Sequence, residues 1–130
     1  MRALPAAYQI DFSNDGELLR AHVTGGDSAV ETLTSYWTAI AEAVAHQQVT
    51  SLLVVDETPG DPPPPEQMLL FVREMAQSGL KGVRIAYVDT VAGHDAEVEF
   101  AEILAREHGF NVRVTGTEAD ARIWLRQAAD

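Results

Sequence analysis

The run Ser51-Leu52-Leu53-Val54-Val55 decides the fold of this chain. It contains no polar residue after its first position, which is typical of a strand that helices cover on both faces. Two further runs of β-type residues follow, at Val83 to Val88 and at Asn111 to Val114. Amphipathic stretches separate the three runs, and this alternation is typical of parallel strands joined by crossover helices. The pattern therefore predicts an α/β fold with Ser51 to Val55 in the centre of its sheet.

An antiparallel pair is predicted ahead of these parallel strands. Tyr8 to Ser13 and Leu18 to Thr24 flank the sequence Asn14-Asp15-Gly16, and an Asp-Gly step between two apolar runs is a strong hairpin signal. The complete predicted order is ββαβαβαβα, which is a mixed sheet that begins with a β-hairpin, continues with β/α units and has helices packed on it. A length of 130 residues matches a single domain over residues 1–130.

Two helix starts are visible in the sequence. Ser28 and Glu31 match a capping box, in which each side chain bonds a backbone amide at the start of a helix. The four prolines from Pro62 to Pro65 predict a stiff, exposed loop, because proline fixes φ and has no amide hydrogen. Pro65 suits the first turn of the next helix, which we expect to extend to a left-handed cap at Gly79.

Composition and charge exclude several classes of function. Nine basic residues against 20 acidic ones leave a formal net charge of -11, which repels phosphate backbones and anionic bilayers, so we expect no nucleic-acid partner. The absence of cysteine excludes disulfides, thiolate metal sites and cysteine nucleophiles. No apolar run approaches the ~20 residues of a membrane span, and the opening sequence MRALPAAYQID has no apolar stretch of signal-peptide length. We therefore expect a cytoplasmic protein with no membrane span.

Acidic residues follow two of the predicted strands. Asp56, Glu57 and Asp89 come at the carboxyl ends of adjacent parallel strands, where open α/β sheets bind their ligands, and their oxygen atoms suit magnesium or calcium. A solvated acidic rim is the competing interpretation, because no strand end supplies a lysine for a phosphoryl group. His94 and Glu97 have H-x-x-E spacing but need a third ligand from another element. Motifs for acyl transfer and nucleotide binding are absent, which favours a non-catalytic protein without a cofactor.

The apolar residues of two predicted helices extend beyond a single buried stripe. Tyr36 and Trp37 are neighbours about 100° apart around a helix axis, so we expect only one to point fully inward and the other to line a groove. The run from Met68 to Val72 is likewise wider than one stripe, which core packing or a docking surface would explain. Together with one loop hydroxyl, the candidate partner or ligand surface consists of Tyr36, Trp37, Thr58, Met68, Leu69, Phe71 and Val72.

Three segments carry a resemblance to a known family. They are the strand Leu52 to Asp56 leading to a helix at Pro65, the block from Lys81 to Asp89 (KGVRIAYVD), and the tail from Gly109 to Leu125. After a leading hairpin, this order resembles the STAS domain of bacterial anti-sigma factor antagonists. It is most similar to the SpoIIAA-like small bacterial proteins that are grouped with the CRAL-TRIO lipid-transfer fold. The resemblance covers nearly the whole chain and implies the same mixed sheet with helices packed on it.

The family also implies two possible roles. Its antagonists carry a serine at the start of the helix after the central strand, where phosphorylation breaks the partner interface. The matching segment here, Asp56 to Gln67, has no serine, and Thr58 is its only hydroxyl. The resemblance therefore implies a regulatory or protein-interaction module that lacks the usual phosphorylatable serine and binds a protein partner. The surplus apolar helix surface of so small a domain also suits a homodimer. The alternative is a carrier of a small apolar ligand or lipid, with a pocket near Tyr36, Trp37, Leu69 and Val72.

Overall fold

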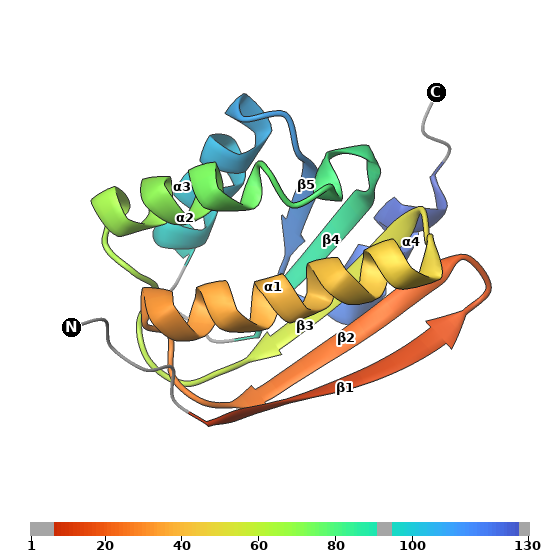
Figure 1. The fold of residues 1–130 in the computed structure, drawn as a ribbon, viewed down its shortest axis with the longest axis horizontal. Helices are drawn as coiled ribbons and strands as arrows, with labels where there is room; N and C mark the ends of the chain where they lie inside the picture. Colours follow the sequence, from red (N-terminus) through yellow and green to blue (C-terminus); the bar gives the residue numbers. More distant parts are fainter. Residues whose placement is uncertain (1–6, 91–94, 128–130) are drawn as a thin grey trace.

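Five strands form one mixed sheet with four helices packed on it in the computed structural model, which describes residues 7–90 and 95–127 (Figure 1). The elements, in chain order, are β1 (Tyr8–Asp15), β2 (Leu18–Gly25), α1 (Val30–Gln47), β3 (Ser51–Glu57), α2 (Pro65–Met75), the 3-10 helix η1 (Leu80–Gly82), β4 (Arg84–Asp89), α3 (Asp95–Glu107), β5 (Asn111–Thr115) and α4 (Glu118–Arg126). The predicted α/β class and the order ββαβαβαβα are therefore confirmed, with one short 3-10 helix added.

The order of strands in the sheet follows the chain, β1-β2-β3-β4-β5. β1 and β2 are antiparallel, whereas β2 to β5 are mutually parallel. The predicted hairpin is present, but β1 continues to Asp15, so its loop consists of Gly16 and Glu17. Gly16 has a φ of 66°, a conformation that glycine adopts without the steric cost that other residues meet.

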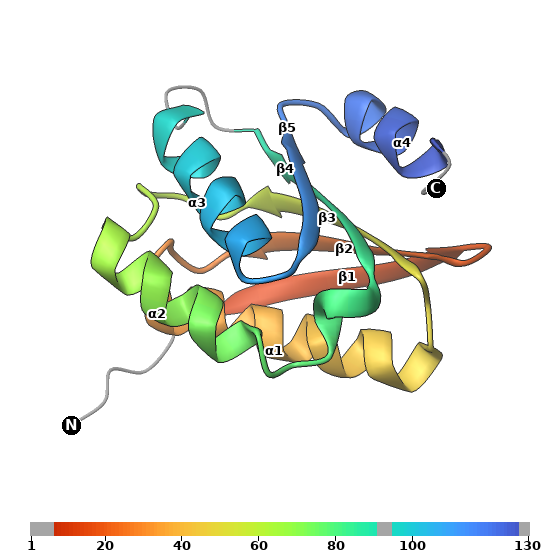
Figure 2. The ribbon, with the colours of Figure 1, turned by 90° about the horizontal axis from the view of Figure 1, so that it is seen from above.

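Helices α1, α2 and α3 cover one face of the sheet and α4 covers the other (Figure 2). Alternate residues of β3 point to the two faces, as expected for a strand. Leu52 and Val54 belong to the larger core under α1 to α3, and Leu53 and Val55 belong to the smaller core under α4. The prediction that Ser51 to Val55 is a central strand covered on both faces is confirmed.

The start of α1 differs from the prediction. Its N-cap is Ala29, which makes no side-chain cap bond, so the predicted capping box of Ser28 and Glu31 is wrong. Asp27 supplies the missing acceptor, because its Oδ1 receives hydrogen bonds from the Ala29 amide and the Thr32 hydroxyl. Ser28 instead donates its hydroxyl to the carbonyl of Pro59 over 2.9 Å. A tertiary acceptor therefore replaces the local one and joins the start of α1 to the loop after β3.

Helix α2 begins at Pro65 as predicted but ends earlier than expected. Its C-cap is Ala76, and the chain then turns to Gly79, whose φ of 88° lies in the left-handed region. The left-handed glycine therefore lies before η1, three residues beyond the C-cap of α2, and does not cap the helix directly. No helix in the described residues is both long enough and apolar enough to cross a membrane.

Side chains of α3 cover one of the two edges of the sheet, the edge formed by β5. β5 is the last strand, and the Val114 amide donates to Glu102 Oε1 over 2.5 Å. One turn along α3, Arg106 Nε donates to the Val112 carbonyl over 2.8 Å. These two side chains replace the partner that an edge strand lacks, which blocks pairing with another chain. They also hold α3 beside β5 and so form one wall of the pocket described below.

A charged cluster joins α4 to the hairpin on the opposite face. Arg20 donates two hydrogen bonds of 3.0 Å to the Glu118 carboxylate, and Arg122 donates to the same group from one turn along α4. The hydrogen bond from Arg20, followed by that from Arg122, lowers the pKa of Glu118 to about 2. Glu118 is therefore ionised at all pH values well above 2.

Glu118→Gln is expected to lower the free energy of unfolding by about 1 kcal/mol near neutral pH. This value is well below the full pKa shift, because the Glu118 side chain is 32% exposed and solvent screens the pair. A depressed carboxyl pKa stabilises the folded state above the ordinary pKa of 4.5, and this contribution is lost as the pH falls from there toward 2. Urea unfolding of both proteins across this range measures the difference. A difference in the free energy of unfolding that did not change with pH would contradict the lowered pKa of Glu118.

Candidate functional site

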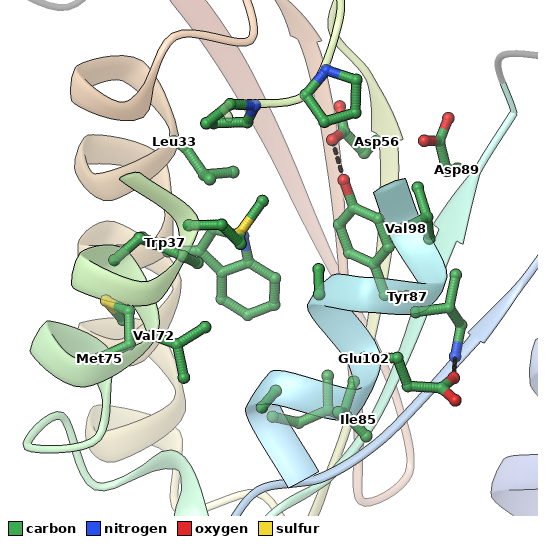
Figure 3. A pocket seen from close by; sticks show the side chains of 18 of the residues that line it. Leu33, Trp37, Asp56, Val72, Met75, Ile85, Tyr87, Asp89, Val98 and Glu102 are labelled. Atoms are coloured by element: carbon green, nitrogen blue, oxygen red, sulfur yellow. Dashed lines mark hydrogen bonds between the residues drawn. The ribbon is translucent and has the colours of Figure 1, made fainter. Parts of the chain in front are cut away.

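A pocket lies between helices α1, α2 and α3 and the face of the sheet beneath them (Figure 3). It extends from Asp56 and Asp89, at the carboxyl ends of β3 and β4, to Ile85 near the start of β4. Its volume is about 130 Å³, close to the ~150 Å³ of an engineered apolar cavity that holds one benzene molecule. The pocket is therefore large enough for a compact ring-sized molecule.

Small side chains on α3 help to leave this space open. Ala101 and Ala105 lie one turn apart on the face of α3 that lines the pocket. Opposite them are the larger Met68, Phe71 and Val72 of α2. An alanine carries only a methyl group, so the two helices cannot fill the space between them. The pocket thus results from the pattern of residue sizes on α3.

Aromatic rings form the inner wall of the pocket. Trp37 is stacked on Tyr87, with ring centroids 6.2 Å apart and planes inclined by 23°, and it also contacts Tyr36 and Phe71 at 6.3 and 6.5 Å. Figure 3 shows the Trp37 and Tyr87 rings projecting into the space between the helices. Trp37 thus links α1, α2 and β4 through ring contacts.

Tyr36 and Trp37 are both buried, being 1% and 9% exposed, so the expectation that only one points inward is wrong. Helix α1 packs against α2 as well as against the sheet, which widens the arc of its surface that is covered. Both residues line the pocket. The sequence pattern of α1 could not show this second contact, because α2 lies more than 15 positions further along the chain.

Asp56 provides the polar end of the pocket. Its Oδ1 accepts hydrogen bonds from the amide and hydroxyl of Thr58, over 2.8 and 2.6 Å. Its Oδ2 accepts a hydrogen bond from Tyr36 over 3.1 Å and a second, short one from Tyr87. A carboxylate has about four acceptor positions, so all of those on Asp56 are occupied by donors of the protein. Asp56 is therefore built into the wall as a fixed negative charge and is poorly placed to act as a base.

The two phenols remain protonated because of their surroundings. Burial raises the pKa of Tyr36 well above 10, and the neighbouring Asp56 charge raises it further. Burial likewise raises the pKa of Tyr87, with contributions from Tyr36 and Asp56. Ionising either phenol would place a second negative charge beside Asp56 in a site with little water. Both hydroxyls therefore act as hydrogen-bond donors at all physiological pH values.

The structure places most of the predicted surface residues in the pocket wall. Thr58 is only 4% exposed and donates its hydroxyl to Asp56, so it is an interior residue. Pro62 and Pro63 are half-buried and line the pocket, which corrects the expectation of a fully exposed proline loop. Leu69 is half-buried but does not line the pocket, in contrast to its helix neighbours. The lining residues that were predicted are Tyr36, Trp37, Thr58, Met68, Phe71 and Val72.

The three carboxylates considered as metal ligands are divided between two faces of the sheet. Asp56 and Asp89 are register partners on the pocket face, whereas Glu57 belongs to the opposite face and bonds His22. Residues 7–90 and 95–127 contain no group of three or more His, Asp or Glu side chains that could hold a metal ion. His94, considered with Glu97, lies outside the described residues.

Sequence reasoning missed Tyr87 and Ala101 as members of the site. Tyr87 is the only aromatic residue in β4, and it lies two positions before Asp89 on the same face. A polar-tipped aromatic between the aliphatic residues of an inner strand is a usable signal, because a buried hydroxyl needs a partner. Ala101 gave no such signal, since alanine is common on buried helix faces.

Charge is distributed unevenly over the pocket wall. Four of the described residues that line the pocket are acidic, namely Asp56, Asp89, Glu97 and Glu102. The described lining residues include no Lys, Arg or His. The remainder of the wall is chiefly apolar or aromatic. The site therefore combines an apolar interior with negatively charged groups. The hydroxyl groups of Tyr36, Thr58 and Tyr87 donate their hydrogen bonds to Asp56.

No protein-family model and no curated protein sequence matches this chain.

Proposed function

We propose that this chain is a non-catalytic binding protein whose pocket under α1, α2 and α3 holds a small apolar molecule. The observation that carries the proposal is the apolar cavity of about 130 Å³ in the larger core. Pockets of this kind, mostly apolar with a few placed polar groups, are the usual form of small-molecule sites. Asp56, the buried carboxylate of the wall, is saturated by hydrogen bonds from its own neighbours, which favours binding over catalysis.

The energetic cost of an empty pocket supports this role. An enclosed cavity in a core costs about 24 cal/mol per Å³, so roughly 3 kcal/mol is the upper bound for a pocket of about 130 Å³ that is partly open to solvent. A ligand that fills the space recovers much of this energy through contacts with Trp37, Phe71 and Val72. A total stability of only 5–15 kcal/mol is usual for a domain, so such a cost is a substantial fraction of it.

Filling the pocket from the protein side tests the proposal. Ala101→Leu is expected to weaken binding of benzyl alcohol, a neutral ring-sized probe, by at least about tenfold, because the new side chain occupies the same space. The matched control is Ala119→Leu, the same change at an exposed position of α4 on the opposite face. Titration calorimetry measures both affinities. Equal binding by wild type and Ala101→Leu would contradict the proposal.

A protein-docking role is the second candidate, and we propose with it a STAS-like fold. The leading hairpin followed by β/α units supports that fold assignment. The docking role is favoured by apolar side chains that face solvent on two adjacent helices, Leu70 of α2 at 63% exposure and Phe100 and Ile103 of α3. They would suit a protein partner or a second copy of the chain. Native mass spectrometry separates the candidates, because a carrier retains a small molecule and a docking module shows a clean monomer or dimer.

A further inference from the structure

We infer that the outer edge of β1 pairs with the same edge of a second copy of this chain, so that the two sheets join into one continuous sheet. The two β1 strands run antiparallel, and a two-fold axis perpendicular to the sheet places Phe12 of one copy opposite Phe12 of the other. No residue of β1 lines the pocket. This inference therefore goes beyond the proposed function and does not depend on it.

The two edges of the sheet differ in what covers them. At β5, Glu102 accepts a hydrogen bond from the Val114 amide and Arg106 donates one to the Val112 carbonyl, so side chains occupy that edge. β1 forms the other edge, is eight residues long and, among the described residues, pairs with β2 alone. Figure 1 shows no other labelled element along its outer side. A long edge strand of this kind is a template for pairing with another chain.

The hairpin decides which backbone groups of β1 face outward. Its loop has two residues, so the pair that closes it, Asp15 and Leu18, is hydrogen-bonded. Hydrogen-bonded and non-hydrogen-bonded pairs alternate along an antiparallel ladder. Every second residue of β1 therefore directs its amide and its carbonyl away from β2. These residues are Tyr8, Ile10, Phe12 and Asn14.

Phe12 is the apolar side chain of this edge that the rest of the chain leaves most exposed. Tyr8 and Ile10 lie on the same face of β1 and are half-buried against the larger core. Phe12 continues this row but is 41% exposed. Aromatic pairs across antiparallel strands stabilise a sheet. A second copy of β1 would therefore cover the Phe12 ring with an identical ring.

Charge selects one of the two registers that bring nearly the whole of both strands into contact. In the first register, Asp11 lies directly opposite Asp11 of the other copy, and like charges in that position are destabilising. In the second, Phe12 lies opposite Phe12 and Asp11 lies opposite Ser13. Asp15 then lies opposite Gln9, so each carboxylate faces a neutral side chain that can donate a hydrogen bond. The second register is self-complementary and closes at two copies.

Sedimentation velocity of the complete chain tests the inference. We expect a monomer–dimer equilibrium with a dissociation constant of about 10–100 µM, because the interface is small. Phe12→Lys is expected to raise this constant at least about tenfold, since two ammonium groups would replace the paired rings. Ile103→Lys, the same change at an exposed apolar residue of α3, is the matched control and should leave the constant unchanged. A chain that stays monomeric at about 1 mM, or a dimer that only Ile103→Lys disrupts, would overturn the inference.

Single cysteines test the register, because the chain has no cysteine of its own and Gln9, Ser13 and Asp15 are exposed. A mixture of Gln9→Cys and Asp15→Cys is expected to form an intermolecular disulfide under mild oxidation, since the Cα atoms of this directly opposite pair would lie about 4.5 Å apart. A mixture of Gln9→Cys and Ser13→Cys is the matched control. Its cysteines would be diagonal neighbours about 7–8 Å apart, so its yield should be at least about tenfold lower. An equal or higher yield in the control mixture would overturn the proposed pairing.

Discussion

Asp56→Ala is expected to lower the free energy of unfolding by about 3–5 kcal/mol, because it removes the acceptor of four hydrogen bonds from buried neutral donors. The variant leaves two phenol hydroxyls and the amide and hydroxyl of Thr58 without their acceptor. Each buried donor without a partner costs about 1–3 kcal/mol, although entry of water reduces the sum. Since whole domains are stable by only about 5–15 kcal/mol, this single residue accounts for a large share. Urea unfolding monitored by tryptophan fluorescence measures the change.

The control for this prediction is the neighbouring residue. Glu57→Ala removes the next carboxylate along β3, which lies on the opposite face and is largely exposed, and is expected to cost less than about 1 kcal/mol. Tyr87→Phe removes one of the four donors and should cost an intermediate amount, about 1–2 kcal/mol. Combining Tyr87→Phe with Asp56→Ala should then cost less than the sum, because the pair interacts directly. Equal losses for Asp56→Ala and Glu57→Ala would show that the network contributes little.

Trp37→Ala is expected to lower the free energy of unfolding by about 3–5 kcal/mol and to enlarge the pocket by the volume of an indole ring. Trp37 is buried and contacts the rings of Tyr36, Phe71 and Tyr87, so its removal opens space that the neighbouring helices cannot fill. The new space joins an existing cavity, which makes the variant able to hold a larger guest. Added indole should therefore raise the melting temperature of Trp37→Ala by mass action.

The second tryptophan provides the matched comparison. Trp124 packs on the smaller core under α4, with the Arg84 guanidinium 3.7 Å from its ring centre. It is only half-buried, so Trp124→Ala is expected to leave a groove open to water in place of a closed cavity. Indole should then stabilise Trp37→Ala by several degrees and leave Trp124→Ala and wild type unchanged. Equal stabilisation of both variants would show that indole binds elsewhere.

Local sequence signals were sufficient where one segment decides its own conformation. The apolar run at Ser51 to Val55 could only be a strand covered on both faces, and the structure places it in the centre of the sheet. Pro65 begins α2 because its fixed φ suits a first helical turn and its missing amide hydrogen is not needed there. In both places the physical constraint acts within a few residues, which is the range that a sequence pattern can describe.

The same signals failed where a distant segment competes with a local partner. Ser28 was expected to cap α1, but the loop after β3 presents the Pro59 carbonyl and takes the hydroxyl. Thr58 was expected on a partner or ligand surface, but it is buried and its hydroxyl donates to Asp56. Each expectation was chemically reasonable for an isolated segment. For Ser28 the outcome depended on a segment about 30 residues away, and for Thr58 it depended on burial of the side chain.

The sequence by itself determined the class of this fold, the order of its elements and the acidic, cysteine-free character of the chain, because period, proline positions and composition act locally or additively. Only the tertiary structure decided that Asp56, Tyr36 and Tyr87 meet, that α3 leaves a cavity beside Ala101, and that Glu57 lies on the other face from Asp56. The physical reason is that cavities and buried hydrogen bonds arise from the distance between elements, which depends on how all the side chains between them pack.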